Sequence, residues 1–145
     1  MNSEKNNRME NGNDNLTTFF RFEDLRVYHK ALEYINWVHS IVRKFPEKEG
    51  GGITNKFTHA AESIALSIAE GSARNRVQFV FYLKAAKSSI RECVVFTSIA
   101  RSLDYLDDDR EQESREHLME MTKMVGALIG SLQRNTTAGE RNENA

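Results

Sequence analysis

The sequence predicts an all-α protein, an antiparallel up-and-down four-helix bundle with disordered N- and C-terminal tails. Four stretches carry apolar residues at helical spacing, and none alternates as a strand does. The chain has one proline, Pro46, and 8 glycines in 145 residues, so long segments are free to be helical. Its composition, 39% hydrophobic and 28% charged, is typical of one globular domain. We expect a tail over residues 1–20, the bundle over 21–134 and a second tail over 135–145.

The first helix is expected between Asp24, a candidate N-cap, and Pro46, which cannot continue a helix. Its apolar residues share one broad face: Leu25, Tyr28, Ala31, Leu32, Ile35, Val38, Val42 and Phe45. Gly50, Gly51 and Gly52 then predict a flexible turn.

The second helix is expected to end at Gly71, a residue type favoured at the position after a helix. Its stripe consists of Ile53, Phe57, Ala60, Ala61, Ile64 and Ile68. Glu70 lies beside the negative end of the helix dipole, which is mildly unfavourable for a carboxylate. Three interpretations stay open: a phosphate or metal site built from Glu70, Gly71 and Arg74, a structural corner between two helices, or no special role.

The third helix is expected to run from Asn75, an N-cap paired with Gln78, to about Leu103. At 100° per residue its apolar side chains cover an arc of about 260°, which one bundle cannot bury. This arc consists of Phe79, Phe81, Tyr82, Leu83, Ile90, Cys93, Val94, Val95, Phe96, Ile99 and Leu103. The remaining arc carries five cations, here called the basic stripe: Arg76, Lys84, Lys87, Arg91 and Arg101. The wide apolar arc predicts an oligomer.

The fourth helix is expected from about Arg110 to Arg134, with its acids in the first turns, where the helix dipole favours them. Its apolar stripe is narrow: Leu118, Met121, Met124, Val125, Leu128, Ile129 and Leu132. A narrow stripe predicts a place at the periphery of the domain.

The basic stripe has two interpretations. It is either a solvated face, which includes pairing with the acidic start of the fourth helix, or a surface that contacts phosphate. The formal net charge of −1 gives the whole chain no general attraction to nucleic acid.

No constellation of catalytic or metal-binding side chains can be assembled from the sequence. The 4 histidines are dispersed, and none follows a glutamate by three residues as a di-iron site requires. Cys93 falls within the apolar arc and is expected to be a buried core residue. Residues 1–15 are polar, and no apolar run approaches the roughly 18 residues of a membrane span. We therefore expect a cytoplasmic protein that is not an enzyme. We expect it to bind no cofactor, metal, membrane or small-molecule substrate.

Three segments resemble a small bacterial family of four-helix bundles named for 23S ribosomal RNA intervening sequences. They are "FEDLRVYHKALEY" at 22–34, "GITNKFTHAAESIALSIAEGSAR" at 52–74 and "FVFYLKAAKSSIRECVVFTSIARSLDYL" at 79–106. The matching positions include Ala60, Ala61, Ser63, Ile64, Ile68, Ala69, Glu70, Gly71, Arg74, Phe79, Leu83, Ala86, Ser88, Glu92, Ile99, Ala100, Leu103, Tyr105 and Leu106. Thr58 and His59 stand where the family usually has two arginines.

The resemblance implies an up-and-down bundle that assembles into a ring-like homo-oligomer, typically a pentamer, without known enzymatic activity. A related branch contains the accessory proteins of diversity-generating retroelements, which bind nucleic acid and work with a reverse transcriptase. The expected partners are thus further copies of the chain, and RNA, DNA or a reverse-transcriptase-like nucleoprotein. The resemblance also favours the structural-corner interpretation, in which Glu70 reaches N–H groups of the third helix or Arg74.

Overall fold

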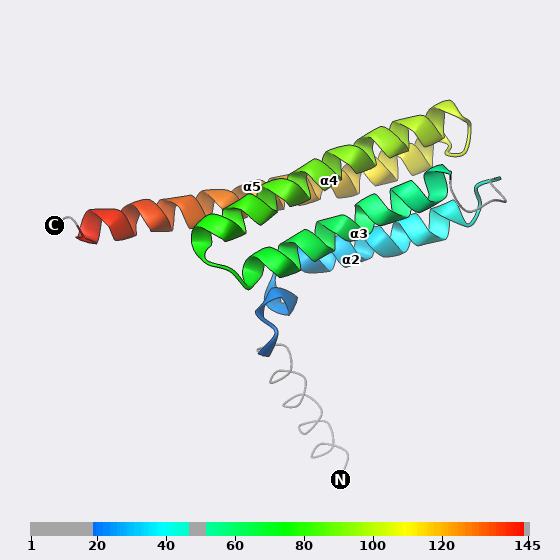
Figure 1. The fold of residues 1–145 in the computed structure, drawn as a ribbon. Helices are drawn as coiled ribbons and strands as arrows, with labels where there is room; N and C mark the ends of the chain where they lie inside the picture. Colours follow the sequence, from blue (N-terminus) through cyan, green and yellow to red (C-terminus); the bar gives the residue numbers. More distant parts are fainter. Residues whose placement is uncertain (1–18, 47–51, 144–145) are drawn as a thin grey trace, which may run out of the picture.

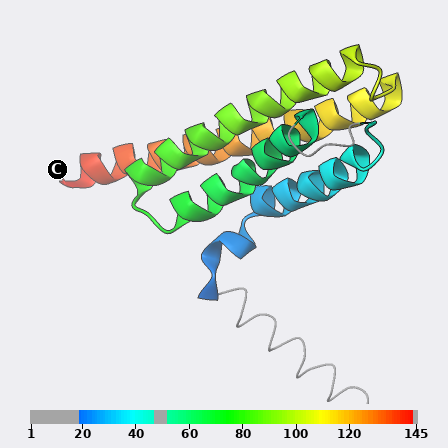
Figure 2. The ribbon, with the colours of Figure 1, turned by 45° about the vertical axis from the view of Figure 1, so that its right-hand side comes forward.

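A computed structural model describes the backbone of residues 19–46 and 52–143 and the side chains as far as residue 134. The short 3₁₀ helix η1 (Arg21–Asp24) precedes four long helices: α2 (Arg26–Val42), α3 (Ile53–Ser72), α4 (Arg76–Ser102) and α5 (Asp108–Glu143). The long helices lie side by side, and successive helices run in opposite directions (Figures 1 and 2). Each one packs against the preceding and following helix, and α5 also packs against α2. The predicted all-α four-helix bundle is confirmed.

The start of the first helix differs from the prediction, because Asp24 is not its N-cap. Asp24 is the last residue of η1, and Leu25 is the N-cap of α2, with an extended backbone and no side-chain hydrogen bond. The Leu25 N–H donates to the Phe22 carbonyl, and the Phe22 ring packs edge-on against Tyr28, 5.1 Å between ring centroids. Packing of aromatic side chains thus holds the segment before α2 against this helix. At its other end α2 stops at Val42, before Pro46, where the end was expected.

The core face of α2 includes most of the predicted residues, among them Ala31, Val38 and Val42, but differs at two positions. Leu32, assigned to the core from its spacing, is 37% exposed, whereas Tyr34 is fully buried. Tyr34 can be buried because its hydroxyl has a partner, the Ser114 hydroxyl of α5 at 2.8 Å. Ser114 is also 2.7 Å from the Thr97 hydroxyl of α4, which donates to the Cys93 carbonyl. This buried chain of hydroxyls connects three helices.

The peripheral position expected for the fourth helix is wrong. Leu118, Met121 and Val125 of α5 are fully buried in the core shared with the other helices. A narrow stripe is sufficient here because a helix at the corner of a four-helix bundle buries only the side that faces its neighbours. The helix also continues to Glu143, past the end predicted at residue 134.

The connections between helices follow the prediction in part. Asn75 is the N-cap of α4, and its Oδ1 accepts from the Gln78 N–H at 2.9 Å, as expected. Gly52 is the N-cap of α3, while Gly50 and Gly51 lie outside the described residues. Residues 1–18 of the expected N-terminal tail and residues 144–145 of the C-terminal one also lie outside them. Within the described segments, no helix combines the length and the apolar character that crossing a bilayer requires.

Candidate assembly and nucleic-acid surface

The outward side of α4 carries exposed apolar side chains near its start and near its end. The inward side is formed by Leu83, Ala86, Ile90 and Cys93, all of them buried. The outer apolar row consists of Val77 (71% exposed), Phe81 (68%), Val95 (56%), Ile99 (39%) and Leu103 (50%). The bundle therefore buries only part of the apolar arc predicted for this helix. Exposed apolar surface of this extent is typical of an interaction site.

The basic stripe is largely free of acidic partners. Arg101 is the exception: its Nη2 lies 2.9 Å from Asp108 Oδ1, and its Nη1 lies 3.4 Å from Asp104. The hydrogen bonds that Arg101 donates to Asp108 raise the pKa of the Arg101 guanidinium. The other four members, Arg76, Lys84, Lys87 and Arg91, form no ion pair with any described residue. Pairing with the acidic start of α5 accounts for one cation of the stripe.

Two acids of α5, Glu113 and Glu120, contact α2 instead. Glu113 accepts from the Trp37 indole N–H at 2.9 Å and from Arg110 at 2.8 Å. These hydrogen bonds, that from Trp37 first, lower the pKa of the Glu113 carboxyl. Glu120 lies 3.4 Å from the Lys30 ammonium. The contacts of Glu113 and Glu120 with α2 could not be predicted from the sequence, because they depend on which side of α5 faces α2.

A further cation joins this face from α5. The Arg115 guanidinium donates to the Ser98 hydroxyl of α4 at 3.2 Å, which places it along the α4–α5 edge. The spacing of cations within α4 could not reveal Arg115, because this residue belongs to another helix. The edge thus presents positive charge from two helices.

Gly71 does not have the role predicted for it. It lies inside α3, which ends at Ser72, and no described glycine has a positive φ. A Cβ at this position would lie 2.6 Å from the Cβ of Tyr82 and 2.9 Å from Phe79 Cδ2. Gly71 is therefore required by the close approach of α3 and α4, not by the conformation of a helix end.

The Glu70 carboxylate binds Arg74 rather than the N–H groups of α4. The Arg74 Nη2 donates to it at 2.5 Å, and the Arg74 guanidinium also lies 5.6 Å from the centroid of the Tyr82 ring. The first of these contacts is the main reason that the pKa of Arg74 is raised. Because both side chains are about half exposed, solvent screens this i,i+4 pair and keeps its contribution to stability small. This contact offsets the unfavourable dipole position of Glu70.

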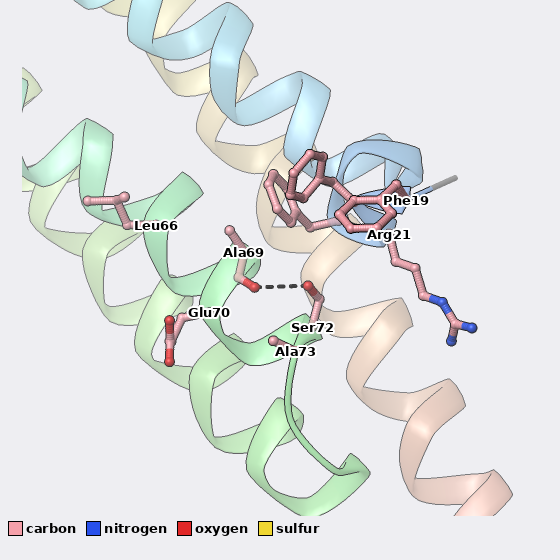
Figure 3. Close-up of a pocket in the computed structure, with 9 residues that line it drawn as sticks. Phe19, Arg21, Leu66, Ala69, Glu70, Ser72 and Ala73 are labelled. Atoms are coloured by element: carbon pink, nitrogen blue, oxygen red, sulfur yellow. Dashed lines mark hydrogen bonds between the residues drawn. The ribbon is translucent and has the colours of Figure 1, made fainter. Parts of the chain in front are cut away.

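A groove that was not predicted from the sequence lies between residues 19–22 and α3. Phe19, Phe20 and Phe22 form one side, around a volume of about 500 Å³. Leu66 and Ala69 of α3 and its C-cap residue Ala73 belong to the other side. Figure 3 shows Phe19 and Arg21 across from Ala69. The available signal was "FFRF" at 19–22, an aromatic cluster that follows a polar stretch. We call this feature the aromatic groove.

The single cysteine of the chain does not provide a reactive thiol on this surface. Cys93 is fully buried, and burial raises the pKa of its thiol to about 12, so it is neutral at physiological pH. No three histidine, cysteine or carboxylate side chains among the described residues converge in a way that could hold a metal ion.

The chain matches a known protein family. A family model described as 23S rRNA-intervening sequence protein matches residues 23–127, which extend from η1 into α5. No curated protein matches the chain.

Proposed function

The chain belongs to the 23S rRNA-intervening sequence protein family, and from this membership we propose that it is a non-enzymatic, cytoplasmic, homo-oligomeric scaffold that associates with nucleic acid. The observation that carries the proposal is the outer side of α4, where an exposed apolar row runs beside unpaired cations. The apolar row serves assembly, with a pentamer as the favoured form. The cations serve contact with RNA or DNA, alone or within a reverse-transcriptase-like nucleoprotein.

We expect the protein to be an oligomer in dilute solution. Val77 and Phe81 expose most of their side chains to water in the single chain, and assembly removes this apolar surface from solvent. Light scattering coupled to gel filtration at micromolar concentration measures the mass directly. A monomeric mass would contradict the proposed assembly.

Nucleic-acid binding is supported by Arg76, Lys84, Lys87 and Arg91, which have no ion-pair partner among the described residues. Repetition of these cations around an oligomer concentrates positive charge, although each chain has a net charge of −1. Binding of this kind is sequence-independent and weakens with salt, because each neutralised phosphate releases about one counterion.

We expect labelled single-stranded and duplex RNA and DNA to bind at low salt and to dissociate at moderate salt. Lys87→Glu combined with Arg91→Glu is expected to weaken binding by at least about tenfold, because two phosphate contacts become repulsive. Arg43→Glu with Lys44→Glu is the matched control, since it makes the same charge change at the exposed end of α2. Equal losses in both variants would show that net charge, and not the basic stripe, controls binding.

The alternative function is a self-assembling protein-interaction module that does not bind nucleic acid. This alternative predicts an intact oligomer that binds none of the labelled nucleic acids at low salt. Binding that is tight and insensitive to salt would instead contradict the electrostatic mechanism.

A further inference from the structure

We propose that Phe81 of one copy inserts into the aromatic groove of the next copy, so that two different surfaces of the chain form the subunit interface. This assignment rests on the homo-oligomer proposed above and identifies the surfaces that meet in it.

The aromatic groove is open within its own chain. Phe19 and Leu66, on opposite sides of it, are 78% and 65% exposed. The rings of Phe19 and Phe20 pack edge to face, 4.9 Å apart, and leave their other surfaces to the groove. Leu66 is the one large apolar side chain that α3 exposes within the described residues. Such a groove suits a single apolar side chain from outside.

Phe81 is the matching protrusion. Its ring is 68% exposed, and the one aromatic ring that it contacts among the described residues is that of Tyr82, at 5.6 Å between centroids. Val77, one turn earlier on the same side of α4, is equally exposed. Because Phe81 projects from α4 and the groove opens beside η1, the groove is not filled by the Phe81 of its own chain.

The protrusion and the groove lie at the same level of the bundle. The turn at residues 73–75 joins α3 to α4, so the distance of a residue along either helix can be counted from this turn. At 1.5 Å per residue, Phe81 lies about 10 Å along α4, while Ala69 and Leu66 lie about 8 and 13 Å along α3. A neighbour rotated about an axis parallel to the helices keeps these levels. Contacts between unlike surfaces then close into a ring when the rotation closes, instead of extending as a filament.

The charges beside the two surfaces are complementary, which favours a second copy over an unrelated apolar peptide. Lys84, one turn beyond Phe81, is exposed and has no ion-pair partner among the described residues. On α3, Glu62 lies one turn beyond Leu66, is 44% exposed and has His39 as its partner at 3.2 Å. When Phe81 occupies the groove, Lys84 comes within reach of Glu62, and Lys87 and Arg91 remain for contact with phosphate. Glu70, which also lines the groove, is already paired with Arg74.

The contact is tested by cross-linking between copies. Phe81→Cys and Leu66→Cys chains are co-expressed with different tags and treated with a short bismaleimide; the native Cys93 is fully buried and does not react. We expect a cross-link that joins one chain of each kind, and none when either variant is present alone. Met119→Cys replaces an exposed residue of α5 and is the matched control with Phe81→Cys. A Phe81–Phe81 cross-link would overturn the inference, because it would place like surfaces together.

The ion pair is tested by charge exchange. Lys84→Glu is expected to weaken the interface, so that the oligomer dissociates at a protein concentration about tenfold higher than the wild type does. Adding Glu62→Lys to the same chain is expected to restore the wild-type value. A wild-type monomer would contradict the proposed oligomer itself. An intact oligomer in which Phe81 and Leu66 positions do not cross-link, or in which Lys84→Glu has no effect, would overturn this interface and leave the oligomer standing.

Discussion

Tyr34→Ala is expected to lower the free energy of unfolding by about 3–5 kcal/mol, the range for removing a large aromatic side chain from a core. Tyr34 is fully buried, and its hydroxyl is the end of the buried chain that continues through Ser114 to Thr97. The substitution leaves a cavity and removes the partner of a buried hydroxyl. Denaturant unfolding measures the loss, at one fixed protein concentration because assembly adds to apparent stability.

Tyr34→Phe separates the two contributions. It keeps the ring and removes the hydroxyl, so we expect a loss of about 1–2 kcal/mol, since Ser114 retains Thr97 as a partner. A loss as large as that of the alanine variant would show that the hydroxyl chain, rather than the packing of the ring, dominates at this position.

Gly71→Ala is expected to destabilise the fold by about 2 kcal/mol, although alanine is the better helix former by about 1 kcal/mol. The new methyl group would lie 2.6 Å from the Cβ of Tyr82, an atom that the backbone of α4 holds in place. The two helices must therefore separate. Thermal unfolding measures the change.

Gly126→Ala is the control for this prediction. Gly126 also lies inside a helix, but a Cβ there meets nothing within 4 Å. The same substitution is then expected to stabilise the protein by about 0.5–1 kcal/mol. If both variants gain stability, the contact between α3 and α4 is not as close as described.

Helical periodicity predicted the four helices because each of them buries one side against its neighbours. Asn75 was recognisable as an N-cap from its own sequence neighbourhood, since its side chain bonds a residue three positions on. Tyr34 was not recognised as a core residue because its burial depends on Ser114, which is 80 positions away. For the same reason the close approach at Gly71 depends on Tyr82 of another helix and was mistaken for a helix end.

The candidate surface was predicted to a smaller degree. The unequal distribution of apolar and basic side chains around α4 followed from the sequence, because it is a property of one helix. The aromatic groove needs η1 and α3 side by side, and Arg115 joins the basic surface only through the packing of α5 on α4. Contacts between elements distant in the sequence leave no local pattern.

The hydrogen bond from Trp37 to Glu113 gives the protein an intrinsic optical reporter. Trp37 is the single tryptophan of the chain, so the tryptophan fluorescence of the protein comes from one indole, which lies between α2 and α5. Detachment of α5 removes the carboxylate and hydrates the ring, which shifts the emission to longer wavelength. Separation of subunits through α4 leaves this environment intact. The emission spectrum therefore distinguishes unfolding of a subunit from dissociation of folded subunits without any added label.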